Sequence, residues 1–280
     1  MSTLIIHDLS SNAGKAHKIN AIVGGHITRH SAFQRIAVNS AMTNEQVANW
    51  RREFDCDLNV IPVNFDPSRV RLVVSDMDST LINIECIDEI ADFAGVKPQV
   101  SAITEAAMRG ELDFAQSLTR RVALLKGLPE SVLERVYVER LKLNPGAEKL
   151  LAGLRRKGIR FALVSGGFTF FAERLRARLG LDYTLANTLE IEDGKLTGKV
   201  VCSIVGAEAK AGFLLQLCEE IGAEPAQAVA MGDGANDLKM MAVAGMGVAY
   251  RAKPKVQEQA HCAINHGELD AILGLLGLDA

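Results

Sequence analysis

The sequence has few cysteines, and their spacing excludes two common structural classes. Five occur in 280 residues, Cys56, Cys86, Cys202, Cys218 and Cys262, and no two of them form a CxxC pair. An odd, scattered set of this kind argues against a disulfide framework and against a zinc site. We interpret these residues as small apolar core side chains.

Strong positive charge and long apolar runs are also missing. The net charge is −3 and the Lys and Arg residues are dispersed among Asp and Glu, so no basic stripe is available to follow a nucleic-acid backbone. No apolar run approaches the roughly 18 residues needed to span a bilayer. Residues 1–10 lack a basic segment followed by a signal-like apolar core. We therefore expect a cytoplasmic protein that binds neither nucleic acid nor membrane.

Alternating strand-like and helix-like segments from residue 69 onward predict the fold class. The composition, 48% hydrophobic with 5% aromatic, is ordinary for a globular protein. Short apolar runs that end in Gly, Ser or Asp are typical of buried parallel strands. They lie at residues 71–75, 159–165, 226–232, 246–250 and, more weakly, 262–265. This pattern predicts an α/β fold with a parallel sheet covered by helices.

The interval between the first two of these strands is too long for a simple crossover. A β-helix-β connection needs only about a dozen residues beyond its strands. Here, amphipathic segments at residues 87–94, 100–108, 114–125 and 131–141 precede the crossover helix. We predict an inserted helical cap at about residues 82–143, placed above the end of the first strand, where a lid excludes water. A hairpin is expected at residues 184–201, turning at residues 192–195.

Residues 1–68 differ in character from the rest of the chain. Strand-like segments at residues 4–7, 33–39 and 58–63 flank one expected helix at residues 44–54, and no catalytic motif occurs there. Gly24 and Gly25 indicate a loop around His26 and His30. We predict a small N-terminal α+β domain at residues 1–68, followed by the main domain at residues 69–280.

An acidic pair marks the end of the first strand of the main domain. Residues 76–80 read Asp-Met-Asp-Ser-Thr, directly after the apolar run. Two such carboxylates are costly to hold together without a cation or a proton. Ligands of open α/β sheets bind beyond the carboxyl ends of the strands, so an active site is expected there. Taken alone, Asp76 and Asp78 also fit a helix cap and turn.

Polar residues follow two further strands. Ser165-Gly166-Gly167 closes the second strand and, in our interpretation, opens a helix, which offers a hydroxyl and free N–H groups to a phosphate. The segment 232–237 adds Asp233, Asn236 and Asp237 at the same edge. Asp233 is a credible Mg²⁺ ligand. By itself, a Ser-Gly-Gly turn is more often a plain loop.

Lys210 has the weakest local signal, because an isolated helical lysine is usually a solvated charge. In order along the chain, however, the D-x-D-x-T segment, Ser165, Lys210 and the acidic segment resemble the haloacid dehalogenase (HAD) superfamily of phosphatases and phosphotransferases. The match runs from about residue 70 to 265. It implies a HAD-like Rossmannoid parallel sheet with a helical cap.

The resemblance also implies a mechanism. It makes Asp76 a nucleophile that forms an aspartyl-phosphate, and Asp78 a general acid and then a base. Mg²⁺ would be held by Asp76, Asp233 and the backbone carbonyl of Asp78. Hydrolysis of a phosphate monoester is so slow without a catalyst that an enzyme must remove on the order of 20 kcal/mol of its barrier. A covalent intermediate divides the reaction into two steps, each of which is easier.

The remaining roles concern the phosphoryl group. Lys210 and Mg²⁺ would neutralise its oxygens, while the Ser165 hydroxyl, the Gly166 N–H and Asn236 fix their orientation. Asp237 would orient Lys210 or a metal-bound water.

Within this superfamily the chain resembles the phosphoserine phosphatases, because Ile82-Asn83-Ile84-Glu85 follows the acidic pair and the lid carries Thr119-Arg120-Arg121-Val122. That resemblance implies hydrolysis of O-phosphoserine to serine and phosphate, the last step of serine biosynthesis. Glu85 would receive the substrate ammonium and Arg121 its carboxylate, with Met108 and Phe114 as apolar contacts.

Other interpretations stay open at the level of sequence. Glu85 also fits a helix N-terminus favoured by the dipole, Arg121 a surface arginine beside Arg120, and Met108 and Phe114 the core face of the lid. The chemistry also fits a phosphotransferase acting on an alcohol such as homoserine. A non-catalytic Mg²⁺-binding signalling receiver is more distant, because a receiver must retain its phosphoryl group. The N-terminal segment is at most similar to an ACT-like regulatory module, and dimerisation through it is a hypothesis.

Overall fold

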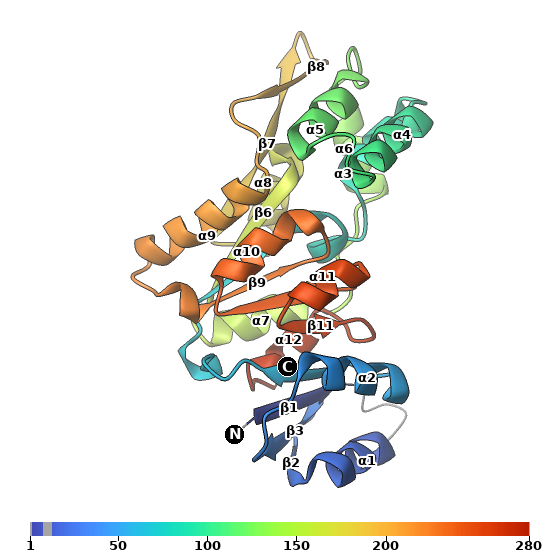
Figure 1. Ribbon diagram of the computed structural model, residues 1–280. Coiled ribbons are helices and arrows are strands. Elements are labelled where there is room, and N and C mark those ends of the chain that lie inside the picture. Colours follow the sequence, from blue (N-terminus) through green and yellow to red (C-terminus); the bar gives the residue numbers. More distant parts are fainter. Residues whose placement is uncertain (1, 8–12, 280) are drawn as a thin grey trace.

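The computed structural model describes residues 2–7 and 13–279. Three parts are stacked along the long axis of the molecule (Figure 1): a small N-terminal sheet with two helices, a central sheet covered by helices, and a helical lid that shares its end of the molecule with a hairpin. Within the described residues, no helix is long and apolar enough to cross a membrane.

The central sheet has seven strands in the order β11-β10-β9-β5-β6-β7-β8. All neighbouring strands are parallel except β7 and β8, which form an antiparallel hairpin. This confirms the predicted α/β fold. The strands are β5 (Leu72–Ser75), β6 (Arg160–Phe168), β7 (Tyr183–Glu192), β8 (Lys195–Val201), β9 (Ala228–Gly232), β10 (Met246–Tyr250) and β11 (Cys262–Ile264).

Strand β5 lies between β6 and β9, so the chain adds strands on one side of β5 and later on the other. Such a reversal leaves a crevice at the carboxyl end of the central strand. Both faces of β5 are buried, because Leu72 and Val74 pack into one apolar cluster and Val73 into another. The apolar run therefore fixes where the following acidic residues emerge.

Helices cover both faces of this sheet. Leu214 of α9 and Met240 of α10 pack against Leu72 and Val74, while Leu150 of α7 lies in the cluster that contains Val73. The helices of this part are α7 (Ala147–Arg156), α8 (Thr169–Leu179), α9 (Ala207–Glu220), α10 (Leu238–Val243), α11 (Pro254–Gln259) and α12 (Ala271–Leu275), with short 3₁₀ turns at Pro67–Arg69, Pro225–Gln227 and Ala235–Asp237.

The lid consists of four helices, as the amphipathic segments predict. They are α3 (Cys86–Phe93), α4 (Lys97–Met108), α5 (Phe114–Ala123) and α6 (Ser131–Glu139). The hairpin β7–β8 lies beside α5 (Figure 1) and is bonded to the lid. The N–H of Gly127 donates to the carbonyl of Leu196 at 2.8 Å, and the N–H of Leu196 to Leu128 at 2.8 Å. The lid therefore leans on a strand extension of the central sheet.

The N-terminal part contains more structure than its sequence predicts. Its elements are β1 (Ser2–His7), α1 (Ala13–Val23), β2 (Gly25–Arg29), β3 (Phe33–Val38), α2 (Asn44–Phe54) and β4 (Leu58–Ile61). Its antiparallel sheet has the order β2-β3-β1-β4, which is the ferredoxin-like βαββαβ arrangement.

Two of these N-terminal elements correct the sequence prediction. The expected loop around His26 was wrong, because His26 lies in β2 and pairs with Ala37. Helix α1 was not predicted. Its apolar signal is weak, since Ala16 and Ile19 are its buried apolar side chains among the described positions, and Gly24 follows it closely.

Side chains of β4 and of the residue just before it fasten this N-terminal part to the edge of the central sheet. The amide of Asn59 donates to the carbonyl of Ala263 at 2.9 Å and accepts from its N–H at 2.8 Å, as a neighbouring strand would. Asp57 accepts from the N–H groups of Asn265 and Gly267, both at 2.7 Å. The N-terminal part thus covers the otherwise open β11 edge.

Candidate active site

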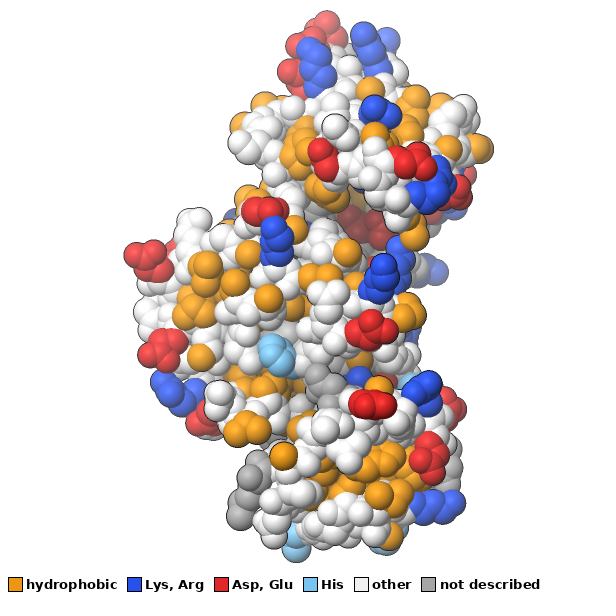
Figure 2. Space-filling view, viewed as in Figure 1, with side chains coloured by type: hydrophobic (Ala, Val, Ile, Leu, Met, Phe, Trp, Pro, Cys, Tyr) orange, Lys and Arg blue, Asp and Glu red, His pale blue; other side chains and the backbone are white. Residues whose placement is uncertain are grey.

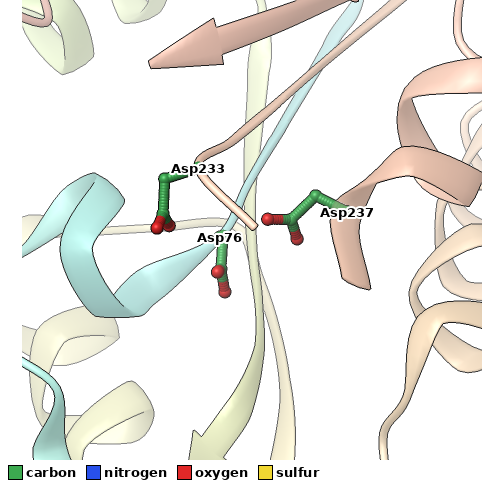
Figure 3. Close-up of side chains that lie close together, drawn as sticks. All are labelled: Asp76, Asp233 and Asp237. Atoms are coloured by element: carbon green, nitrogen blue, oxygen red, sulfur yellow. The ribbon is translucent and has the colours of Figure 1, made fainter. Parts of the chain in front are cut away.

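Three carboxylates from two strand ends meet beyond β5. Asp76 directly follows β5, Asp233 follows β9, and Asp237 ends the 3₁₀ turn directly before α10 (Figure 3). Their ligand oxygens all lie within 4.8 Å of one another. Figure 2 shows a hollow between the lid and the central part, with acidic side chains set back inside it. The predicted meeting of the two acidic segments at one sheet edge is therefore present.

A fully buried lysine pairs with two of these carboxylates. The side chain of Lys210, on α9, is 0% exposed, and its Nζ lies 2.7 Å from Asp76 Oδ1 and 2.7 Å from Asp237 Oδ1. Burial alone would lower the pKa of Lys210, but Asp237 and Asp76 raise it above its ordinary value. Isolated charges in such a place are expensive. The charged ammonium form is therefore favoured, and its contact holds the Asp76 carboxylate in place.

The same cluster suits a hard divalent cation. Both oxygens of Asp237 are engaged, Oδ1 by Lys210 and Oδ2 by the N–H of Gly234 at 3.1 Å. Asp76, by contrast, uses Oδ1 for its bonds to Lys210 and to the N–H of Met77. Burial and the charge of Asp237 raise the pKa of Asp233 to about 6. One lysine leaves this all-oxygen set with surplus negative charge, so the cluster could hold a hard divalent cation.

Asp78 lies in a different environment from Asp76. Its carboxylate accepts from the N–H of Cys86 at 3.1 Å and from the Ser165 hydroxyl at 3.4 Å. Burial raises its pKa, although these hydrogen bonds and the charge of Lys210 act in the opposite direction. A raised pKa favours the protonated form of a carboxyl, which suits it to donating a proton.

The Ser165-Gly166-Gly167 segment reaches the site, but the expected helix start there was wrong. Strand β6 continues to Phe168, with a register shift against β7 between Val164 and Phe168. Such a bulge re-aims side chains next to a site. The Ser165 hydroxyl accepts from the N–H of Gly167 at 2.7 Å. The cradle is therefore a bulged strand end and not a helix N-terminus.

Close approaches explain the glycines of this segment. A Cβ on Gly167 would lie 2.5 Å from Asp78 Oδ2, and one on Gly166 would lie 2.6 Å from the Phe114 ring. Phe114 thus reaches down from the lid onto the strand end. Met108 is 64% exposed and its Sδ lies 3.6 Å from Lys253 Nζ, so it lies at the boundary between lid and core.

The two charged residues assigned to the lid side face the site. Arg121 is half-buried whereas Arg120 is exposed. Burial lowers the pKa of Arg121, whereas the charges of Asp88, Glu85 and Asp78 raise it. Glu85 is exposed to solvent, but desolvation by the protein around it and the charge of Asp78 raise its pKa to about 8.

Three further side chains support the site. The half-buried Asn236 lies over its own loop, because a Cβ on Gly234 would be 2.3 Å from Asn236 Oδ1. Sequence reasoning missed Thr80, whose hydroxyl donates to Asp233 at 3.1 Å although it belongs to the D-x-D-x-T motif. It also missed Asn187, which donates to the Gly166 carbonyl at 2.8 Å and has no distinguishing local pattern.

The central sheet and this cluster define an α/β protein with a helical lid above a group of carboxylates at a strand switch point. A model of haloacid dehalogenase-like hydrolases matches residues 70–245. The chain belongs to this family. The predicted superfamily is thereby confirmed.

Relatives with assigned names are similar over most of the chain. The phosphoserine phosphatase of Polaromonas sp. is 54% identical over 224 residues, which cover 78% of this chain and 95% of the relative. The phosphoserine phosphatase of Haemophilus influenzae is 53% identical, covering 79% of this chain and 71% of its own length.

Solved structures extend the similarity to the N-terminal part. An HAD family hydrolase from Salmonella enterica matches with a TM-score of 0.90 and 33% identity over 99% of both chains. A probable phosphoserine phosphatase from Vibrio cholerae, in an unliganded form, matches with a TM-score of 0.83 and 40% identity, covering 99% of this chain and 86% of that one.

Proposed function

We propose that this protein hydrolyses O-phosphoserine to serine and phosphate, the last step of serine biosynthesis. The observation that supports this most is the half-buried Arg121 on the lid, which interacts electrostatically with Glu85 and Asp78. An arginine and an acid on the two walls suit a zwitterionic amino acid. The relatives named phosphoserine phosphatase support the same substrate.

Asp76 is the proposed nucleophile. Its carboxylate attacks phosphorus, the serine oxygen leaves, and the phosphoryl group is held on Asp76 until water displaces it. Lys210, 2.7 Å from Asp76 Oδ1, offsets charge on the phosphoryl oxygens. Asp237 holds Lys210 in that position through the second 2.7 Å contact.

Asp78 is the proposed proton carrier. Protonated, it donates to the leaving serine oxygen; ionised, it takes a proton from the attacking water. Its raised pKa suits the first task. The Ser165 hydroxyl, the Gly166 N–H and the Asn236 side chain are proposed to orient the phosphoryl oxygens.

Mg²⁺ is the proposed cofactor, with Asp76, Asp233 and the backbone carbonyl of Asp78 as its protein ligands. When bound it supplies positive charge to the phosphoryl oxygens. The proposal rests on the donor chemistry, since carboxylate and carbonyl oxygens are what Mg²⁺ selects. Thr80 holds Asp233 for this purpose through its 3.1 Å hydrogen bond.

The lid supplies substrate selectivity in this proposal. Glu85 receives the substrate ammonium group and Arg121 its carboxylate, in a bidentate fork that lysine does not reproduce. Phe114, packed over Gly166, closes the site from above. Met108, at the boundary of the lid, is the proposed second apolar contact of the substrate.

A phosphate-release screen across small phosphomonoesters, with and without Mg²⁺, tests this function. We expect Mg²⁺-dependent release that is fastest with phosphoserine. A preference for sugar phosphates would contradict the substrate assignment. Adding an alcohol such as homoserine shows where the phosphoryl group goes, because a phosphotransferase would place it on the acceptor and not release it to water. Family membership already favours an enzyme over a signalling receiver.

We also propose that residues 1–68 form a separate N-terminal domain that contributes to a homodimer. Strand β2 is an exposed edge of its sheet, which supports a role in association. Sedimentation of a variant lacking residues 1–66 tests this, and an unchanged oligomeric state would refute it.

A further inference from the structure

Ser79 has an unusual backbone and a specific hydrogen bond. Its φ of 56° and ψ of −2° lie in the left-handed region, which costs energy for a residue with a Cβ. Its hydroxyl donates to Glu85 Oε1 at 2.7 Å, and its N–H donates to the carbonyl of Ile84 at 3.1 Å. The loop that follows Asp78 therefore closes back onto Glu85, and the strained conformation aims the hydroxyl at that carboxylate.

Asn144 holds the same loop from the other side. It is 8% exposed, and its side-chain amide donates to the carbonyls of Thr80 at 2.8 Å, Ile82 at 3.1 Å and Ser79 at 3.4 Å. Its own N–H donates to the carbonyl of Leu81 at 3.0 Å. One buried side chain thus fixes most of the main chain between Asp78 and the lid.

These contacts lie where the lid joins the core. The outgoing and returning segments pair antiparallel through Ile82 and Leu143. An outer rung follows, in which the exposed Asn83 accepts from the N–H of Lys142 at 2.9 Å. The two asparagines therefore offer a matched pair: Asn144 on the buried rung that touches the catalytic loop, and Asn83 on the exposed rung that does not.

We propose that Ser79 and Asn144 are positioning residues that hold Glu85 in place to receive the substrate's amino group. Ser79 orients the carboxylate directly, and Asn144 keeps Ser79 in its strained conformation. Recognition of the amino group is thereby tied to the hinge of the lid. This inference rests on the proposed function, in which Glu85 meets the ammonium group.

The test compares phosphoserine with 3-phosphonooxypropanoate, which lacks only the amino group, by the ratio of their kcat/KM values. Ser79→Ala and Ser79→Gly both remove the hydroxyl, but Gly also relieves the positive φ. We expect both to reduce the wild-type ratio by roughly 10-fold, the effect of one hydrogen bond to a charged group. A loss of folding alone would lower kcat/KM for both substrates by the same factor and leave their ratio unchanged.

Asn144→Ala should lower the same ratio, whereas Asn83→Ala should leave it unchanged. A wild-type enzyme that does not distinguish the two esters would refute the role of Glu85, and this inference with it. A wild-type enzyme that distinguishes them while both Ser79 variants keep the full ratio would overturn only the inference about Ser79. If the Asn144 and Asn83 variants had equal ratios of kcat/KM, Asn144 would have no part in positioning Glu85.

Discussion

The core side and the lid side of the site differ in how firmly their charges are held. On the core side, Lys210 contacts Asp76 and Asp237 at 2.7 Å, and all three are buried. On the lid side, Arg121 is half-buried, and among the described residues its side chain makes one long hydrogen bond, which Nε donates to the carbonyl of Ser117 at 3.4 Å. A fixed core suits chemistry that is common to all phosphate esters. A looser lid suits contacts that form when one particular substrate arrives.

The comparison predicts its largest effect for Asp76→Asn. The amide keeps the shape but cannot form the acyl-phosphate, so kcat should fall by roughly 10⁴-fold or more. Phosphate release measures turnover, and equilibrium dialysis with phosphoserine should show that binding persists. Asp193→Asn, the same change in the exposed hairpin turn, is the control. Full activity of Asp76→Asn would refute the nucleophile.

Removing the buried ammonium group of Lys210 should affect folding as well as turnover. Lys210→Met leaves Asp76 and Asp237 buried without their partner, which costs about 3 to 5 kcal/mol. Urea unfolding measures this loss. Lys239→Met is the matched control, because Lys239 pairs with Glu208 at the surface, where a pair contributes about 1 kcal/mol or less. Equal losses in the two variants would show that the core is not held as described.

Arg121→Ala tests the lid side. Losing the carboxylate fork should cost roughly 2 to 4 kcal/mol of transition-state binding to phosphoserine. It should have little effect on phosphoethanolamine, which lacks the carboxylate. Arg120→Ala, at the exposed neighbouring position, is the control. If Arg121→Ala kept the wild-type preference for phosphoserine over phosphoethanolamine, Arg121 would not be the group that binds the substrate carboxylate.

The sequence predicts well those features that depend on residues close together in the chain. Buried strands such as β5 and the lid helices follow from local apolar patterns, and the acidic pair follows from its place after a strand. Lys210 has no local signal, because its partners Asp76 and Asp237 are distant in the chain. Its role was implied by family resemblance alone. Thr80 lay inside a recognised motif and was still overlooked.

Errors arose where local patterns conflict with packing. Gly24 and Gly25 favoured a loop, but pairing with β3 makes a strand of the residues that follow. Ser165-Gly166-Gly167 read as a helix start, but β7 keeps the segment in the sheet through a bulge. The glycines there accommodate Phe114 and Asp78, which come from other parts of the chain. No pattern within the segment contains that information.

The smallest predicted effect is the pH dependence of the stabilisation by Mg²⁺ on the core side. The pKa of Asp233 is raised from 3.8 to about 6, so the folded state binds this proton more tightly than the unfolded state does. Without metal, this group should therefore reduce stability as pH rises from about 4 to about 6. Mg²⁺ competes with the proton, so its stabilisation should be larger at pH 7.5 than at pH 5.

Thermal unfolding with and without Mg²⁺, at matched ionic strength, measures this difference. At about 100-fold above Kd, bound Mg²⁺ adds roughly 2.7 kcal/mol. Asp233→Asn should abolish the Mg²⁺ shift at both pH values, because it removes a proposed ligand and the titrating group together. An equal shift in wild type and variant would locate the cation elsewhere. Lys210 would then be the group that offsets the negative charge of the carboxylates, and the case for phosphoryl chemistry on the core side would be no stronger than on the lid side.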